Sequence, residues 1–190
     1  NSALAHYSKS SKEEILKNGS LVLIDCGGYF EGGLATDITR VFVKGEPSEL
    51  QKQIYTTVLK AFLRAFNSTN TNSGYVIDKV ARDFLEENAP DGFVFNHGLG
   101  HGIGVSVHEG PPRLTTVGED AEVTLEDNMC FTIEPGLYKQ DFFGVRLENS
   151  CYLKNDKIES FSNMCYEKKL IDYSLLNEQE KQWLSKFEVK

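Results

Sequence analysis

Acidic residues at the ends of short apolar segments constrain this chain more than any other feature of its sequence. Asp25 and Glu134 end such segments, Asp37 begins one, and Glu148 lies inside a predicted strand. A buried carboxylate costs free energy unless it is hydrogen-bonded, paired or bound to a metal ion. Carboxylates that lie close together also need a cation or a shared proton. Each acid taken alone also fits a turn or an exposed position, so the interpretation depends on what accompanies the four.

A second group of polar residues lies in the glycine-rich segment 96–111. Three of the four histidines, His97, His101 and His108, fall within twelve residues there, together with four glycines that let the backbone approach a site closely. One histidine in a core is usually satisfied by hydrogen bonds, whereas three in such a segment favour a metal site or proton transfer. Four carboxylates and one imidazole form a mostly oxygen ligand set, which suits a pair of divalent ions such as Mn²⁺, Zn²⁺ or Co²⁺.

The segments that carry these residues predict short strands. Strands are expected at five places: 21–26, 37–43, around Val105, 130–134 and 145–153. The first is an apolar run that we expect to be buried, and the glycine-rich stretch after it predicts a hairpin with the second. Alternation along a strand places Arg146 and Glu148 on the same side.

Three amphipathic helices are expected among these strands. The first follows a capping box at residues 48–51, and its apolar side chains recur at helical spacing: Leu50, Ile54, Val58, Phe62 and Phe66. The second helix places Val76, Val80 and Phe84 on one face, and Asn177 can cap a last helix. This order of elements predicts an α+β fold, a curved antiparallel sheet with helices on its outer face.

Length and charge narrow the functions that this chain can have. A chain of 190 residues suits one domain, and a net charge of −8 disfavours nucleic acid and anionic membranes as partners. No apolar run approaches the roughly 20 residues of a membrane span. The four cysteines are widely spaced without a Cys-x-x-Cys pair, which favours reduced thiols in a cytoplasmic protein. Because the chain has no initiator methionine, we expect a fragment of a longer protein.

The motifs around these residues resemble those of the pita-bread metallopeptidases. The resemblance rests on segments spread along the chain: Asp25, 36–40, 100–104, 107–111, 132–136 and 145–149. The order of the acids and the histidine matches that superfamily too. The resemblance implies a pita-bread fold and a two-metal site with five ligands: Asp25, Asp37, His101, Glu134 and Glu148. It implies Mn²⁺ first, with Zn²⁺ or Co²⁺ as alternatives.

Within that superfamily the chain resembles most the Xaa-Pro aminopeptidases (aminopeptidase P). Three features favour them over the methionine aminopeptidases: the pair His6-Tyr7, Arg146 just before the last acid, and the tail 170–184. Prolidase, an Xaa-Pro dipeptidase, is a near alternative with a less similar tail. A non-catalytic pita-bread module that binds peptides is the alternative from another class. The resemblance also implies that residues 1–190 are a partial catalytic domain, without the preceding domains and the opening helices.

The implied activity is release of the N-terminal residue from peptides with proline in second position, by attack of a metal-bridging hydroxide. Asp37 and Glu148 would bridge the metals, Asp25 would complete one site, and His101 and Glu134 the other. The segment from Asp25 to Asp37 is one residue longer than in the family, and a bulge or a longer turn can absorb the extra residue. A homodimer is compatible with the resemblance.

The resemblance also implies roles around the metals. Glu134 would pass a proton to the leaving amine, and His108 would stabilise the oxyanion. His97 would contribute to catalysis, and together with His6 and His108 it would bind the substrate. Arg146 would orient the first or the last of the metal-ligating acids.

Overall fold

The computed structural model describes residues 13, 15–68, 72–162 and 164–188. His6 and Tyr7, which the sequence assigns to the substrate side, lie outside the described residues. The α-helices in the described part are α1 Glu49–Phe66, α2 Gly74–Asn88 and α3 Glu178–Ser185. The strands are β1 Leu21–Cys26, β2 Ile38–Val43, β3 Gly100–His101, β4 Arg113–Leu114, β5 Cys130–Ile133, β6 Gly136–Tyr138, β7 Gly144–Arg146, β8 Asn149–Lys154 and β9 Lys157–Ser160. Within the described ranges, no helix is long and apolar enough to cross a membrane.

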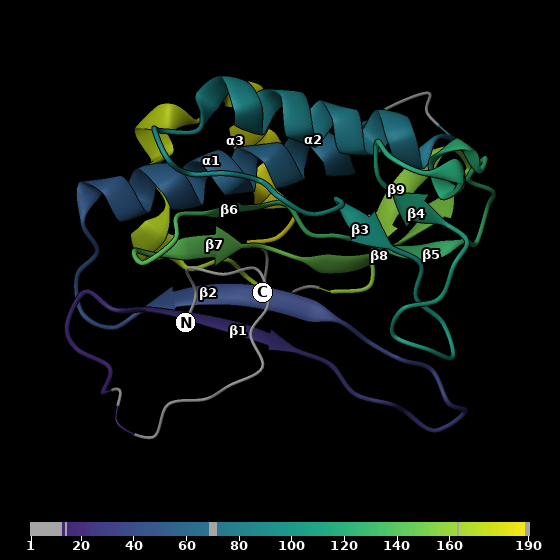
Figure 1. The fold of residues 1–190 in the computed structure, drawn as a ribbon, viewed down its shortest axis with the longest axis horizontal. Coiled ribbons are helices and arrows are strands. Elements are labelled where there is room, and N and C mark those ends of the chain that lie inside the picture. The colour runs from purple at the N-terminus through teal and green to yellow at the C-terminus, as the bar shows by residue number, and fades with distance from the viewer. Residues whose placement is uncertain (1–12, 14, 69–71, 163, 189–190) are drawn as a thin grey trace.

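The fold has a layer of short antiparallel strands with the helices on one side of it (Figure 1). The strands pair in the orders β1-β2, β3-β4, β5-β8-β9 and β6-β7. Backbone hydrogen bonds join these small sheets: the Glu148 N–H donates to Thr39 at 3.1 Å, and the Glu134 N–H donates to Leu99 at 2.7 Å. The predicted α+β class and the helices on one face are confirmed, and the joined strand ends bring the acids into one region.

Helix α1 begins and packs as its sequence predicts. The Gln51 N–H donates to Ser48 Oγ at 3.2 Å, and the Ser48 N–H donates to the Gln51 side chain at 2.8 Å, which completes the capping box. Ile54, Val58 and Phe62 are fully buried against the strands and the C-terminal segment. Burial stabilises each such side chain by about 1.5–3 kcal/mol. Helix α1 therefore forms the centre of the core behind the strand layer.

The predicted inner face of helix α2 is wrong. Val76 is 43% exposed and Val80 is 37% exposed, while Ile77 and Ala81 are fully buried. Two adjacent rows of side chains on this helix repeat every four residues, so apolar spacing fits both of them. The row that faces inward lies beside Asp78, which is fully buried in an ion pair. The helix is thus rotated toward the side that buries this charge.

The hairpin of β1 and β2 keeps a single register up to its turn. The pair of Cys26 opposite Ile38 and the bridge between Tyr29 and Ala35 keep one register. The chain therefore reverses over residues 30–34 without a bulge. Of the two possibilities in the sequence, a bulge is thus absent from this hairpin, and its strands place Asp25 opposite Thr39.

Three strand predictions need correction. The strand expected over 145–153 is divided into β7 and β8, which belong to different sheets and leave Leu147 and Glu148 between them. Strand β1 is half exposed rather than buried, with Ile24 45% exposed, because β1 pairs only with β2 among the described strands. No strand forms around Val105, which is 65% exposed. The Gly104 carbonyl next to it instead accepts a 2.8 Å hydrogen bond from the Ala35 N–H. This bond ties the loop after β3 to the hairpin.

Candidate metal centre and active-site cleft

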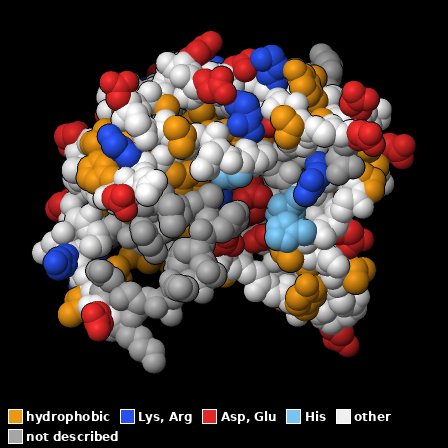
Figure 2. All heavy atoms as spheres, in the orientation of Figure 1, with side chains coloured by type: hydrophobic (Ala, Val, Ile, Leu, Met, Phe, Trp, Pro, Cys, Tyr) orange, Lys and Arg blue, Asp and Glu red, His pale blue; other side chains and the backbone are white. Residues whose placement is uncertain are grey.

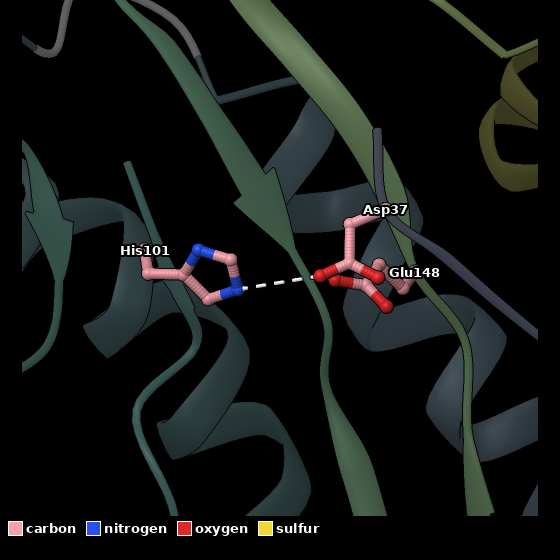
Figure 3. A group of neighbouring side chains, drawn as sticks. All are labelled: Asp37, His101 and Glu148. Atoms are coloured by element: carbon pink, nitrogen blue, oxygen red, sulfur yellow. Dashed lines mark ion pairs between the residues drawn. The ribbon is translucent and has the colours of Figure 1, made fainter. Parts of the chain in front are cut away.

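Three of the predicted ligands meet where strands of different sheets end. Asp37 precedes β2, His101 ends β3, and Glu148 lies between β7 and β8 (Figure 3). Their ligand atoms all lie within 4.8 Å of one another. His101 Nε2 is 3.7 Å from Asp37 Oδ2. A single cation can therefore contact all three side chains.

The other two predicted ligands border the same cleft. Glu134 follows β5, and its Oε1 is 3.5 Å from His101 Nε2. Asp25 pairs with Thr39 across the hairpin, so alternation places its side chain on the face that also carries Asp37. All five predicted ligands line one cleft of about 730 Å³, a size within the roughly 300–1,000 Å³ of clefts that bind small ligands. Figure 2 shows acidic and histidine side chains around a hollow in the surface.

Hydrogen bonds behind the acids fix their orientation. Thr39 donates to Glu148 Oε2 at 2.6 Å, and Arg146 donates through Nε to the Thr39 hydroxyl at 3.3 Å. Arg146 also donates to the Tyr138 hydroxyl at 3.1 Å and to the Asp25 carboxylate. Arg146 thus contacts the first acid directly and reaches the last one through a hydroxyl.

Sequence reasoning missed two members of this network, Thr39 and Tyr138. Thr39 carries a detectable signal, because it follows Asp37 by two residues in a strand and so shares its face. Tyr138 carries none, since the pairing of β6 with β7 that brings it to Arg146 joins segments whose register the sequence does not specify.

Burial and mutual repulsion dominate the electrostatics of the cleft. Burial and the charge of Asp25 raise the pKa of Asp37 to about 6. Burial is also the main cause that raises the pKa of Glu134 to about 8. Burial and the charge of Glu134 hold the pKa of Glu148 well above its usual range. Burial lowers the pKa of His101, which favours the neutral imidazole that metal binding requires.

The donor set fits divalent cations. Glu148 Oε1 is buried and has no hydrogen-bond partner among the described residues. A buried acceptor without a partner costs about 1–3 kcal/mol, which a cation in the cleft would offset. Burial is the main cause of the raised pKa values, and repulsion between the acids adds to it, so a cation would favour their charged forms. Oxygen donors with one imidazole nitrogen match Mn²⁺, Zn²⁺ and Co²⁺.

Glycines beside His101 allow the close packing that places its ring. A side chain at Gly100 would collide with the Thr132 carbonyl, and one at Gly102 would collide with the Glu109 carbonyl. Thr132 accepts a hydrogen bond from the His101 N–H at 3.1 Å through its hydroxyl. The glycine spacing noted in the sequence therefore lets β3 lie directly against β5 and present His101 to the acids.

The two remaining described histidines also line the cleft. The centroid of the His108 ring lies 4.2 Å from that of His101. The His97 ring has Nδ1 2.7 Å from the Gly98 carbonyl oxygen and Nε2 2.9 Å from the Tyr138 hydroxyl. The His108 ring thus stands beside a predicted ligand, and the His97 ring lines the same cleft, where the sequence expected both to contact substrate.

The fold and the acidic, histidine-bearing cleft are those of metal-dependent peptidases. Residues 1–155 match the model of metallopeptidase family M24, and the chain belongs to this family. The expected resemblance to the pita-bread metallopeptidases is thereby confirmed.

Similar proteins extend along the whole chain. A probable Xaa-Pro aminopeptidase P from Arthroderma otae is 35% identical over 100% of this chain and 32% of its own length. The crystal structure of an X-prolyl aminopeptidase from Caenorhabditis elegans, described as a cytosolic enzyme with a di-nuclear active site, covers 98% of this chain and 32% of that one, with a TM-score of 0.85 and 27% identity. A prolidase from Pyrococcus horikoshii covers 90% of this chain and 46% of that one, with a TM-score of 0.77 and 36% identity. The chain spans about a third of the length of the curated relatives that it matches.

Proposed function

We propose that this chain carries the active site of a metal-dependent aminopeptidase that releases the N-terminal residue from peptides with proline in second position. The main support is the convergence of four carboxylates and His101 on one cleft, with a buried Glu148 oxygen that lacks a partner among the described residues. The similarity to Xaa-Pro aminopeptidases over the whole chain supports the substrate class.

In this proposal two divalent cations are held by five side chains: Asp25, Asp37, His101, Glu134 and Glu148. When bound, they lower the pKa of a water molecule and polarise the scissile carbonyl. We place Mn²⁺ first, because the donors are mostly hard oxygens, with Zn²⁺ or Co²⁺ as alternatives.

The surrounding side chains move protons and orient the peptide. Glu134 lines the cleft beside His101, so its carboxylate can accept a proton there and give it to the leaving amine. His108 lies beside His101 and can donate a hydrogen bond to the carbonyl oxygen as negative charge develops there. His97 contacts the substrate, and Arg146 holds Asp25 in place.

Selection for proline follows from the chemistry of the bond. The Xaa-Pro bond is a tertiary amide without an N–H, so the site cannot position it through that donor. The flat rings of His97 and His108 on the cleft wall suit the proline ring. A prolidase is the second candidate, and the similarity to the Pyrococcus horikoshii prolidase favours it. A prolidase requires the free carboxylate of a dipeptide.

The test compares hydrolysis of Arg-Pro-Pro, Gly-Pro and Met-Ala-Ser with added Mn²⁺. Dominant cleavage of Arg-Pro-Pro supports the proposal. Turnover of Gly-Pro alone indicates a prolidase, and turnover of Met-Ala-Ser alone refutes selection for proline. No turnover of any peptide by a metal-loaded protein indicates a peptide-binding module. A His101→Ala variant serves as control for a contaminating peptidase.

A further inference from the structure

Helix α2 carries a buried ion pair that faces the back of the cleft. Arg82 Nη2 lies 3.0 Å from each carboxylate oxygen of Asp78, whose side chain is fully buried. The same helix carries a second pair of the same spacing, Lys79 with Asp83, whose side chains are about half exposed. A buried ion pair is weak evidence for stability, because desolvation costs about as much as the attraction contributes. The burial of the Asp78–Arg82 pair therefore calls for an explanation other than stability, which the exposed Lys79–Asp83 pair does not need.

Arg82 reaches beyond its own helix to the segment that bears His97. Its Nη2 donates to the His97 carbonyl oxygen at 2.7 Å, and its Nη1 donates to the Phe95 carbonyl oxygen at 3.4 Å. The guanidinium carbon lies 4.4 Å from the centroid of the Phe95 ring, which meets the His97 ring edge-on at 4.8 Å. Arg82 thus holds both the backbone of His97 and the ring against which the imidazole packs.

Asp78 faces the segment that follows β4. The backbone N–H of Thr116 acts to lower the pKa of its carboxylate, and the neighbours Thr115 and Val117 line the cleft. Helix α2 packs against β4, the strand that leads into this segment. One ion pair therefore ties two cleft-lining segments to one helix.

The position of the His97 backbone sets the tautomer of its ring. A carbonyl oxygen only accepts hydrogen bonds, so the 2.7 Å contact with Gly98 requires a proton on Nδ1. The neutral ring then accepts at Nε2 from the Tyr138 hydroxyl, 2.9 Å away. That hydroxyl in turn accepts from Arg146. A shift of the 95–98 segment would break this arrangement at its first bond.

We propose that the Asp78–Arg82 pair is a positioning device, which holds His97 in one orientation and one tautomer toward the substrate. Neither residue touches the substrate, and each acts through the segments that it holds. The inference rests on the proposed peptidase function for the role of His97, while the orientation of the ring can be measured without any turnover.

The first test reads the ring directly in the full chain loaded with Zn²⁺, which is diamagnetic. Long-range ¹H–¹⁵N spectra report the tautomer of each histidine, and His97→Gln identifies the His97 signals. We expect a dominant Nδ1–H tautomer in the parent and a mixture with the Nε2–H form in Arg82→Lys, which keeps the charge but loses the planar fork. Asp83→Asn on the exposed pair should leave the signals unchanged. An unaltered His97 tautomer in both Arg82→Lys and Asp78→Asn would overturn the proposal.

The second test is a double-mutant cycle on kcat/KM for Arg-Pro-Pro. We expect Arg82→Lys to lower kcat/KM about tenfold in the parent and less than about twofold in the His97→Gln background, because the two residues act as a unit. A merely structural role predicts the same loss in both backgrounds, and that result would refute the proposal. If the parent cleaves no peptide, the proposed function fails, and the spectra still decide whether the pair positions His97.

Discussion

The hydroxyl of Thr39 donates a 2.6 Å hydrogen bond to one oxygen of Glu148, while the other oxygen, Oε1, has no hydrogen-bond partner among the described residues. Both residues are almost fully buried. The bond fixes the rotation of the carboxylate, so that the second oxygen is available to a cation shared with Asp37 and His101. The hairpin thus determines how an acid more than one hundred residues later is presented.

The first prediction removes this bond. Thr39→Val keeps the shape of the side chain but leaves the Glu148 carboxylate free to rotate. We expect about tenfold weaker metal binding, as is typical when a ligand loses its orienting partner. Isothermal titration with Mn²⁺ measures it. The matched control is Thr57→Val, a buried threonine on α1 whose hydroxyl donates to Gln53 within the helix. Equal affinities in the two variants would contradict the assignment.

The second prediction separates metal binding from substrate contact with two histidines. His101→Ala removes the nitrogen donor of the cluster, so we expect loss of metal from one site and loss of hydrolysis. His97→Gln leaves the five predicted ligands intact, so we expect retained metal with reduced kcat/KM. Metal analysis by plasma mass spectrometry and peptide hydrolysis measure the pair. Two metals bound to a fully active His101→Ala protein would show that His101 is not a ligand.

Local patterns in the sequence predict much of this fold. The capping box before α1 and its buried row involve residues within a few turns of each other, so they can be found without tertiary information. The placement of Asp25 and Asp37 on one face also follows from strand alternation once a hairpin is assumed. The sequence pattern indicates the three histidines of segment 96–111 only as a group, and the family resemblance singles out His101 as the ligand.

The features that could not be predicted depend on contacts between distant segments. The inner face of α2 includes Asp78, whose ion pair with Arg82 and surroundings at Thr116 are invisible in the helix pattern. Tyr138 reaches Arg146 through strand pairing that no local signal specifies. Apolar periodicity places charged residues on the exposed face of a helix. The predicted face is therefore wrong where a charged side chain, such as Asp78, is buried.

The third prediction tests the face of α2. Ile77→Ala removes a fully buried side chain, and we expect it to lower the free energy of unfolding by about 2–5 kcal/mol. Val80→Ala trims a side chain that is 37% exposed, and we expect a change within about 0.5 kcal/mol. Urea denaturation followed by circular dichroism measures both. The reverse order of effects would support the face expected from the valines.

The fourth prediction concerns pH and the protein without metal. Asp37 and Glu134 have pKa values of about 6 and about 8 in the fold, above the ordinary values of 3.8 and 4.5. The folded state therefore holds protons that the unfolded state has released, and stability falls as pH rises through this window. We expect the melting temperature in chelator to decrease from pH 5 to pH 8. Saturating metal should raise it most at pH 8, because the cation replaces those protons.

The lowered pKa of His101 has the opposite effect on the dependence of stability on pH. Burial lowers the pKa of His101, so its contribution to stability rises as pH passes its ordinary value of 6.5. The three cleft carboxylates with raised pKa values, Asp37, Glu134 and Glu148, outweigh one imidazole, so the net slope should remain negative. A melting temperature in chelator that rises steadily from pH 5 to pH 8 would contradict the account of the cleft.

The last prediction is that Glu148 lowers the stability of the metal-free protein and is needed for stabilisation by metal. Its carboxylate is almost fully buried, and this burial, followed by the negative charges of Glu134 and Asp37, holds its pKa well above the usual range. Glu148→Gln removes the carboxyl whose ionisation is disfavoured at this buried position, and it keeps an oxygen that can accept from Thr39. In chelator at pH 8 we therefore expect a higher melting temperature than in the parent, by several degrees. With metal added, the parent should gain stability and the variant should gain almost none, because an amide is a poor bridging ligand. Scanning calorimetry with and without Mn²⁺ gives the melting temperatures of both proteins.

The exposed Glu159→Gln on β9 controls for the general loss of a negative charge, and it should leave both the stability and the response to metal unchanged. A Glu148→Gln protein that is less stable than the parent in chelator, or that responds fully to metal, would mean that Glu148 serves the fold rather than a cation.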